Sequence, residues 1–316
     1  MSLKLFQTRG CVVLSQLAKV MGYPDTTFDD YMQVNSFFEP FLLSVEKNFR
    51  MDTTLNFVTK YAWIAPPTCL AYLCLIYTFQ RYMKRRPSFH LRPILLYWNL
   101  ALSILSFWGM MRMVPILLFY LYTHGFRSSV CDVSTFPVMS GASGFWTAIF
   151  IFSKYFELLD TFFIIFRKRN LSFLHWYHHV TVLLCSWYSF ISKQPAALYF
   201  CAMNYTVHTV MYFYYFLATL NPKPPKWGIY VTFLQILQMI AGCIITSITF
   251  FYSHNFLFNF GLKPYHSTIT PSVSSCAISR SSLYASIIMY WSYLYLFSAF
   301  FYRRYIRKSS TAKKLV

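Results

Sequence analysis

Seven long apolar stretches constrain this sequence more than any other feature does. A helix needs about 20 predominantly apolar residues to cross the hydrocarbon core of a bilayer. Seven segments meet that requirement, at residues 62–80, 94–121, 144–166, 172–192, 196–219, 227–252 and 281–302. Only 12% of all residues are charged, whereas a typical soluble domain carries about 25%. The sequence therefore predicts an all-α, polytopic membrane protein with seven transmembrane helices.

Basic residues alternate between the two sides of this predicted topology. The first, third and fifth connections and the C-terminal tail contain Arg81, Lys84, Arg85, Arg86, Arg92, Arg167, Lys168, Arg169, Lys223, Lys226, Arg303, Arg304, Arg307, Lys308, Lys313 and Lys314. The other connections contain Arg127, Lys193, Lys263 and Arg280. Because basic connections face the cytoplasm, we expect a lumenal N-terminus and a cytoplasmic C-terminus. This divides the chain into a lumenal segment at 1–60, a membrane domain at 61–302 and a basic tail at 303–316.

Acidic residues are missing from the predicted cytoplasmic connections. Ordinary topology bias is one explanation of this asymmetry. The other is a basic entrance that attracts a polyanionic substrate, and the two explanations are compatible.

Two cysteines, Cys131 and Cys276, fall in different connections on the predicted lumenal side. An oxidising lumen permits a disulfide between them. Two free thiols are the alternative that the sequence leaves open. The eight cysteines of the chain form no CxxC pair and no metal-ligand spacing.

The strongest chemical signal is the run His175-Trp176-Tyr177-His178-His179 in the fourth predicted helix. The three histidines are spaced i, i+3 and i+4, so they share one helical face. Imidazoles inside a membrane are costly and are usually functional. Direct acid, base or nucleophilic chemistry is one interpretation, and a single zinc ion is another.

The remaining histidines do not form a second cluster in the sequence. They are His90, His124, His208, His254 and His266. Histidine-rich di-iron sites of membrane oxidases use several such boxes, so this distribution argues against that class of site. We therefore favour direct imidazole chemistry over a metal.

Polar side chains also recur at helical spacing in neighbouring predicted helices. The third helix contributes Lys154, Glu157, Asp160 and Thr161, the fifth Asn204, His208, Tyr212 and Tyr215, and the sixth Gln235 and Gln238. Charges within a span normally face the bundle interior and pair there. A structural ion pair of Lys154 with Glu157 and packing hydrogen bonds of the glutamines are the plainer interpretation. The functional interpretation is a polar chamber, closed to bulk water, beside an apolar tunnel.

In combination, these motifs resemble the very-long-chain fatty acid elongases of the endoplasmic reticulum. The resemblance rests on Lys154-x-x-Glu157-x-x-Asp160-Thr161, His175-x-x-His178-His179, His208-x-x-Met211-Tyr212 and Gln235-x-x-Gln238, in the family's order. It covers residues 60–310, approximately. Residues 174–184 are similar to the branch that extends saturated and monounsaturated chains.

The resemblance implies a fold and a reaction. The fold is a seven-helix bundle in which six helices form an inverted barrel around an acyl tunnel. The reaction joins long-chain acyl-CoA and malonyl-CoA to give 3-oxoacyl-CoA, CO2 and CoA. Neither a metal nor a redox cofactor is implied. The C-terminal Lys313 and Lys314 are similar to a dilysine retrieval signal of the endoplasmic reticulum.

The resemblance also suggests partners. They are the two CoA substrates and the ketoreductase, dehydratase and enoyl reductase that complete an elongation cycle. A homo-oligomer is left open, and no nucleic acid is expected.

The chemistry of such a reaction assigns roles to the predicted site residues. We expect His178 to form an acyl-imidazole and His208 to transfer protons or to stabilise an oxyanion. His175 and His179 orient the site. Asn204 and Tyr212 donate to oxyanion charge, and Lys154, Glu157 and Asp160 tune the network.

Other interpretations stay open at this point. In a rival mechanism for the same reaction, all the histidines act as general bases. The alternative function is a metal-dependent membrane fatty acid hydroxylase or desaturase. A seven-span receptor or channel is a third class, although such a protein has no need for clustered intramembrane histidines.

Overall fold

The structure is a computed structural model that describes residues 42–131, 141–223, 225–254, 276 and 278–307. These residues form helices and turns, with no β-strand among them. The elements are α3 (Ser44–Lys47), α4 (Met51–Lys60), η2 (Ala62–Ile64), α5 (Ala65–Met83), α6 (Arg92–Cys131), α7 (Gly141–Glu157), α8 (Leu159–Phe166), α9 (Phe173–Ile191), α10 (Ala197–Leu220), α11 (Gly228–Ser253), α13 (Arg280–Phe301) and a π-helical turn η4 (Tyr302–Arg307). The prediction of an all-α chain is confirmed for the described residues.

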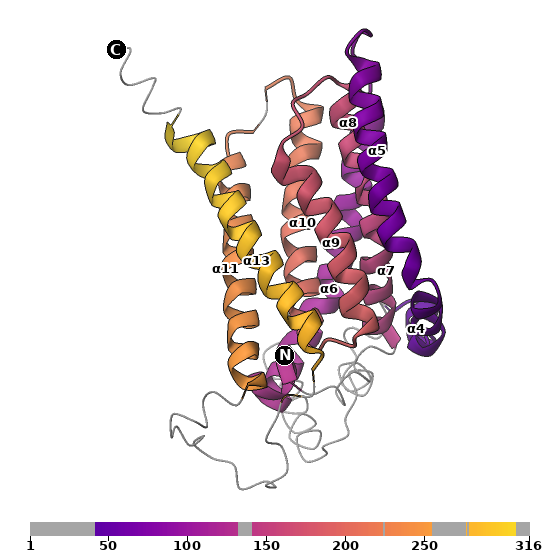
Figure 1. Ribbon diagram of the computed structural model, residues 1–316, viewed down its shortest axis with the longest axis vertical. Helices are drawn as coiled ribbons and strands as arrows, with labels where there is room; N and C mark the ends of the chain where they lie inside the picture. The colour runs from indigo at the N-terminus through magenta and orange to yellow at the C-terminus, as the bar shows by residue number, and fades with distance from the viewer. Residues whose placement is uncertain (1–41, 132–140, 224, 255–275, 277, 308–316) are drawn as a thin grey trace, which may run out of the picture.

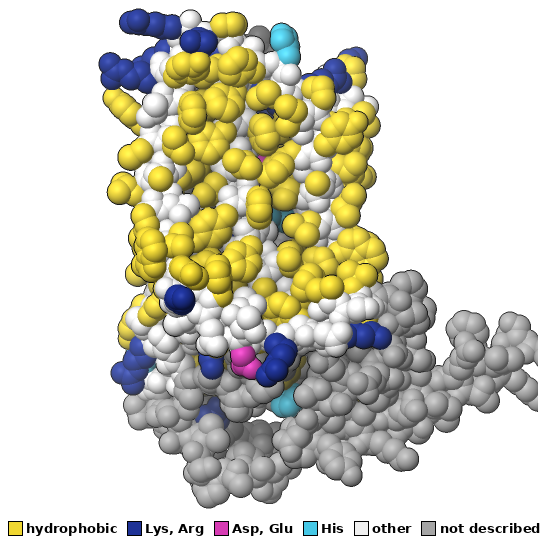
Figure 2. Space-filling model, turned by 90° about the vertical axis from the view of Figure 1, so that its right-hand side faces the viewer, with side chains coloured by type: hydrophobic (Ala, Val, Ile, Leu, Met, Phe, Trp, Pro, Cys, Tyr) yellow, Lys and Arg dark blue, Asp and Glu magenta, His cyan; other side chains and the backbone are white. Residues whose placement is uncertain are grey.

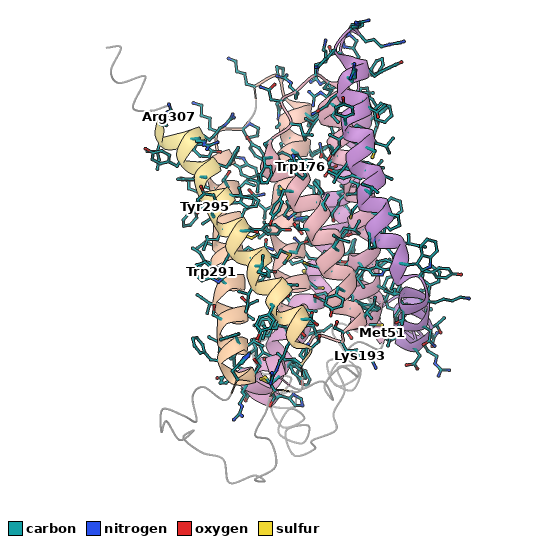
Figure 3. The ribbon with its side chains drawn as sticks, in the orientation of Figure 1. Met51, Trp176, Lys193, Trp291, Tyr295 and Arg307 are labelled. Atoms are coloured by element: carbon teal, nitrogen blue, oxygen red, sulfur yellow. A yellow bond between two sulfur atoms is a disulfide. The ribbon has the colours of Figure 1, made fainter. Side chains whose placement is uncertain are left out.

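The long helices run along one common axis (Figure 1). The most extensive packing is between α6 and α10, followed by that between α11 and α13. Figure 3 places Arg307 near one end of this bundle and Met51 and Lys193 near the other. We call the first the Arg307 end and the second the Lys193 end.

A belt of hydrophobic side chains covers the middle of the face shown in Figure 2, with Lys and Arg side chains above and below it. Four helices in the described part of the chain are long and apolar enough to cross a membrane. They are Ala62–Met83, Arg92–Tyr122, Gly228–Ser253 and Arg280–Arg307. The chain is thus a multi-pass membrane protein.

The other predicted spans, which correspond to α7 with α8, α9 and α10, are shorter or less apolar. The helix α7 has 17 residues and α8 has 8. The helices α9 and α10 contain the histidines and other polar residues discussed above, which lower their mean hydropathy. The polar chemistry inside the bundle therefore weakens the apolar signal of the helices that carry it.

Two predicted spans differ from the helices observed. The span predicted at 144–166 is divided into α7 and α8 at Leu158. The N–H of Leu158 bonds to the carbonyl of Tyr155 at 3.3 Å, which closes a four-residue turn. The span predicted at 94–121 extends to Cys131. Its backbone leaves helical geometry at Gly125 (φ 73°, ψ 168°) and not at Pro115. Positive φ is readily adopted only by glycine, which explains the place of this break.

Residues before the first span are anchored to the bundle by a buried ion pair. Arg112 of α6 donates from Nε to Oε1 of Glu46 at 3.1 Å, and both side chains are buried. The indole N–H of Trp146 also donates to Glu46. At the same end of the molecule, a disulfide joins Cys131, the last residue of α6, to Cys276. These contacts fix the short helices α3 and α4 and the segment before α13 to the transmembrane helices.

Candidate active site

Two cavities meet inside the bundle. The larger is a cleft of about 2540 Å³, including the space at its open side, lined mainly by α6, α8, α9, α10, α11 and α13. The smaller is a mostly apolar cavity of about 670 Å³, a volume that again includes open space beside it, lined by α7, α9, α10, α11 and α13. Four residues line both cavities, namely His178, Asn204, Gln238 and Met239. We call this shared wall the junction.

The cleft combines basic and histidine side chains. Arg92, Arg167, Arg169 and Arg304 line it toward the Arg307 end. Deeper in the bundle it is lined by His175, His178, His179 and His208. The clustered histidines of α9 and the single histidine of α10 therefore face one space.

Lys154 and Glu157 form a buried pair behind that space. The Nζ of Lys154 donates to Oε1 of Glu157 at 2.7 Å and to Oδ1 of Asn204 at 2.9 Å. Ser153 adds a hydrogen bond to the same carboxylate oxygen at 3.1 Å. The interpretation of Lys154 and Glu157 as an ion pair matches this geometry, and the lysine links the pair to Asn204 of α10.

The carboxamide of Asn204 also contacts His208. Its Nδ2 lies 3.1 Å from Nε2 of His208. Because Lys154 donates to Oδ1, the amide nitrogen faces His208 and can only donate. His208 is therefore neutral in this arrangement, with its proton on Nδ1. That atom lies 3.9 Å from Oε1 of Glu157, which is an electrostatic contact too long for a hydrogen bond.

His175 is fixed by a different set of contacts. Its Nε2 lies 3.0 Å from the hydroxyl of Thr161 in α8. That hydroxyl also bonds to Tyr72 of α5. The ring of His175 lies 4.5 Å from that of His179, which is buried. His175 and His179 thus form the wall beside His178, with His175 braced by two other helices.

His178, unlike His175 and His208, has no hydrogen bond to its imidazole among the described residues. The ring of the buried His179 lacks one as well, but only His178 among the four histidines lines both cavities. The ring of His178 packs against Tyr293 of α13 at 4.9 Å between ring centroids. An imidazole nitrogen facing a cavity is available for a substrate.

Asp160 does not join the Lys154–Glu157 pair, although the sequence places all three on one polar stripe. Its carboxylate accepts from Trp98 Nε1 at 2.6 Å and from the hydroxyl of Tyr212 at 2.8 Å. The interruption at Leu158 separates Asp160 from α7, and Asp160 therefore has a network of its own. The proton of Tyr212 is directed to Asp160, which argues against the expected role of Tyr212 as an oxyanion donor.

The glutamines of α11 lie at different depths. Gln238 is buried at the junction. Gln235 lines the cleft only, and its Nε2 donates to the sulfur of Met211 at 3.2 Å. The structure thus brings Gln238 beside His178 and Asn204 and gives Gln235 a contact with α10.

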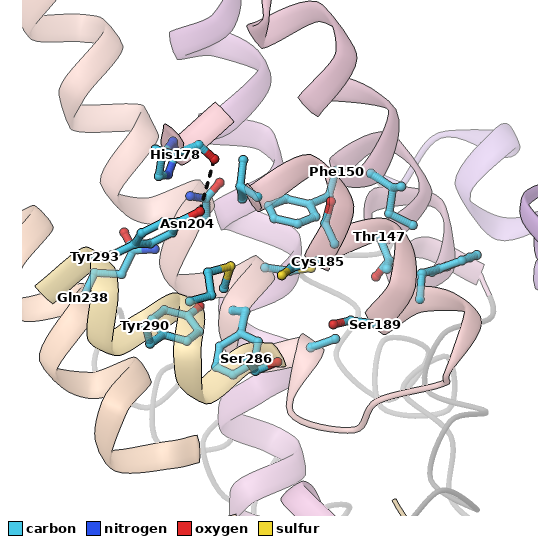
Figure 4. Close-up of a pocket in the computed structure, with 18 of the residues that line it drawn as sticks. Thr147, Phe150, His178, Cys185, Ser189, Asn204, Gln238, Ser286, Tyr290 and Tyr293 are labelled. Carbon is cyan, nitrogen blue, oxygen red and sulfur yellow. Dashed lines mark hydrogen bonds between the residues drawn. The ribbon is translucent and has the colours of Figure 1, made fainter. Parts of the chain in front are cut away.

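The smaller cavity extends from His178 and Asn204 at the junction to Ser189 and Ser286 (Figure 4). Its walls are mainly aliphatic, aromatic and sulfur-containing side chains, with a few serine and threonine hydroxyls. They include Phe150, Ile151, Val182, Cys185, Phe190, Phe200, Cys201, Met289 and Tyr290. Such a surface fits a hydrocarbon chain, since each buried methylene contributes about 0.8 kcal/mol.

Several contributors to the site were not among the residues predicted from the sequence. Trp98 holds Asp160, Tyr293 packs on His178, and Arg304 lines the cleft. Only the charge of Arg304 gave a signal, through the basic C-terminal tail. Lys313 and Lys314 lie outside the described residues. Within the described part of the chain, no group of three or more His, Cys, Asp or Glu side chains is placed to bind one metal ion.

Comparison with known proteins identifies the family. The sequence profile of the ELO family, described as GNS1/SUR4 family, matches residues 57–313. The chain is 41% identical to a Drosophila melanogaster protein named very long chain fatty acid elongase 6, over 84% of this chain and 79% of that protein. It is 36% identical to the human very long chain fatty acid elongase 3, over 89% of this chain and 95% of that protein. For very long chain fatty acid elongase 6 of Gallus gallus the identity is 38%, over 77% and 85% respectively. From its transmembrane helices to its basic tail, this chain belongs to the ELO family.

Proposed function

We propose that this protein is the condensing enzyme of fatty acid elongation, an acyltransferase that converts acyl-CoA and malonyl-CoA into 3-oxoacyl-CoA, CO2 and CoA. The relatives that this chain matches over most of their length are named as elongases. The observation that carries the proposal is the junction, where His178 stands between an apolar cavity and a cleft lined by arginines. A thioester has the same division, with a hydrocarbon chain on one side of the reacting carbonyl and a polyanionic carrier on the other.

The chemistry of the two cavities suits the two halves of the acyl substrate. The hydrocarbon chain occupies the apolar cavity, and the phosphates of CoA face the arginines of the cleft, which are suited to bind them. This placement brings the thioester carbonyl to the junction. Malonyl-CoA binds in the same cleft after the first CoA has left.

In the proposed mechanism, His178 is the nucleophile. Its ring nitrogen attacks the thioester carbon, the C–S bond breaks, and a proton passes from the acylated ring to the departing CoA thiolate. Malonyl-CoA then loses CO2, and the enolate carbon so formed bonds to the acyl carbon. The C–N bond to His178 breaks, and the ring takes up one proton from solvent. This is the one proton that the overall reaction consumes, and it completes the cycle.

Asn204 and His208 support these steps. The amide of Asn204 has two N–H groups, of which one faces His208. The second is free to donate to oxyanion charge at the junction. His208 lines the same cleft and serves the proton transfers. The rival mechanism, in which the histidines act only as general bases, forms no covalent acyl adduct on His178, so mass spectrometry of enzyme treated with acyl-CoA alone separates the two.

The proposal extends to topology and location. Seven spans, formed by α5, α6, α7 with α8, α9, α10, α11 and α13, give a lumenal segment at 1–60 and a cytoplasmic tail at 303–316 in the endoplasmic reticulum. Six of the helices form an inverted barrel around the acyl tunnel. The clustering of basic connections at the Arg307 end supports this orientation, as does the dilysine pair Lys313 and Lys314. The ketoreductase, dehydratase and enoyl reductase of the cycle are proposed partners, as is a second copy of this chain.

The reaction as proposed uses no metal and no redox cofactor, because every step is acyl transfer, decarboxylation or proton transfer. A metal-dependent hydroxylase or desaturase, the alternative from the sequence, is not supported by the named relatives. Metal analysis of the purified protein tests this part of the proposal directly.

The decisive experiment uses microsomes that contain the full chain, labelled malonyl-CoA and a panel of acyl-CoAs. We expect 3-oxoacyl-CoA that depends on both substrates, and its loss in His178→Ala. The matched control is His254→Ala, since His254 directly follows α11 and lines neither cavity. Undiminished product formation by His178→Ala overturns its catalytic role, and no product from the unmodified protein overturns the proposed function.

A further inference from the structure

In the proposed mechanism His178 needs an unbonded ring nitrogen to react, and it also needs a fixed ring orientation. His175 is oriented by Thr161 and His208 by Asn204, each through a ring nitrogen. His178 has to keep a nitrogen free to attack the substrate, and its ring has no hydrogen bond among the described residues. Its orientation must therefore come from packing and from the backbone that carries it.

Tyr293 supplies both. It is a residue of α13, only 2% exposed, and it lines the apolar cavity next to His178 (Figure 4). Its hydroxyl donates to the backbone carbonyl of His178 at 3.1 Å and lies 2.6 Å from the hydroxyl of Thr181. One phenol group thus touches two residues of α9 within a single helical turn of the reactive side chain.

The ring of Tyr293 also limits the side chain of His178. The two ring centroids are 4.9 Å apart with an interplanar angle of 43°. Phe297, one turn further along α13, approaches the same imidazole at 6.4 Å and 88°. Two aromatic rings of one helix therefore flank the imidazole, and the hydroxyl fixes that helix to α9.

We infer that Tyr293 is a positioning residue for the reaction, acting through His178 to hold the free imidazole at the junction. This inference rests on the proposed function. A nucleophile has to be held to within about 0.5 Å of its productive place, and a shift of about 1 Å can cost about 100-fold in rate. The hydroxyl acts on the reactive geometry, while the ring alone is enough to form the cavity wall.

The test compares kcat and KM for acyl-CoA in four variants of the full chain. Tyr293→Phe keeps the ring and is expected to lower kcat about tenfold with KM changed less than about twofold. Thr181→Val removes the second partner of the Tyr293 hydroxyl and is expected to lower kcat. Thr181→Ser keeps a hydroxyl partner there and is expected to have the kcat of the unmodified enzyme. Thr181 lines neither cavity. In the double variant Tyr293→Phe/Thr181→Val, kcat is expected to fall no further than in Tyr293→Phe, because the two residues act as one unit.

Tyr205→Phe is the matched control. The hydroxyl of Tyr205 also donates from one helix to a backbone carbonyl of another, that of Trp146 at 2.8 Å, and Tyr205 lines neither cavity. We expect it to lower thermal stability and leave kcat unchanged.

The outcomes separate this inference from the proposed function. An unmodified protein without condensing activity overturns the proposed function. If the unmodified protein is active, three results overturn the role of Tyr293 and leave the proposed function standing. They are an unchanged kcat in Tyr293→Phe, a change in KM alone, and an equal loss of kcat in Tyr205→Phe. Should Tyr293→Phe fail to fold, the pair Thr181→Val and Thr181→Ser decides, and equal kcat values in both overturn the inference.

Discussion

The carboxamide of Asn204 connects the buried ammonium of Lys154 to the imidazole of His208, with its Oδ1 2.9 Å from Lys154 Nζ and its Nδ2 3.1 Å from His208 Nε2. A lysine on α7 thus determines which way an amide on α10 faces, and the amide determines which nitrogen of His208 carries the proton. The charged pair behind the cleft in this way sets the hydrogen-bonding state of groups that line it.

Asn204→Asp tests this relationship with almost no change in shape. A carboxylate accepts from Lys154 but cannot donate to His208 or to an oxyanion. We expect kcat to fall by about 100-fold, the usual effect of losing one oxyanion donor. Steady-state kinetics with acyl-CoA and malonyl-CoA measure the change. A kcat within a factor of about two of the unmodified enzyme contradicts the role given to the amide.

Lys154 and Glu157 allow stability and catalysis to be separated. Removal of one partner of a buried ion pair costs about 3–5 kcal/mol, whereas replacement of both by apolar residues can be nearly neutral. We therefore expect Lys154→Met and Glu157→Leu each to lower the unfolding temperature in detergent. The double variant should recover much of it.

The double variant should nevertheless stay inactive, because Lys154 then no longer fixes Oδ1 of Asn204 and the amide can turn its oxygen toward His208. Activity assays on the folded double variant check this expectation. Full activity in that variant shows that the pair is structural only, which is the plainer interpretation of the sequence.

Local spacing predicted much of the site, but not the contacts between distant helices. His175, His178 and His179 share one face at i, i+3 and i+4, and the structure has all three lining the cleft with His208. By contrast, Trp98 meets Asp160 across 62 positions of sequence, and Tyr293 meets His178 across 115. A helical pattern predicts which residues share a face of one helix. It does not predict which residue of another helix packs against that face.

The division of the third predicted span shows the same limit. Lys154, Glu157 and Asp160 have the spacing of one stripe, and a continuous helix was therefore expected. A four-residue turn at Leu158 divides the helix and gives Asp160 different partners, Trp98 and Tyr212. No glycine or proline marks this turn in the sequence.

Glu46→Gln tests whether the segment before the first span stabilises the bundle without taking part in catalysis. The substitution removes the negative charge that faces Arg112, and we expect a loss of about 3 kcal/mol of stability. The kcat per folded molecule should not change, since Glu46 and Arg112 line neither cavity. Asp52→Asn is the control, because it removes an exposed acid in the same segment. Thermal unfolding in detergent compares the two variants. Equal unfolding temperatures would show that the ion pair of Glu46 and Arg112 does not stabilise the bundle.

A contact between α11 and α13 limits the width of the apolar cavity. Gly242 lies directly against the ring of Tyr290, and a Cβ atom at position 242 would overlap that ring. Tyr290 lines the cavity and also packs against Phe200 at 4.7 Å between ring centroids. A side chain at 242 therefore pushes Tyr290 toward the space proposed for the hydrocarbon chain.

Gly242→Ala should therefore shift the enzyme toward shorter acyl chains. Overpacking costs about 1–3 kcal/mol and displaces neighbouring side chains, so we expect kcat/KM to fall more for long than for short acyl-CoAs. Gly109→Ala is the matched control, because its new methyl group would overlap Tyr205 in the same way at a place that lines neither cavity. It should lower stability and leave the chain-length profile unchanged. Product lengths from a mixture of acyl-CoAs measure both profiles, and a parallel shift in the two variants means that Tyr290 does not limit the chain.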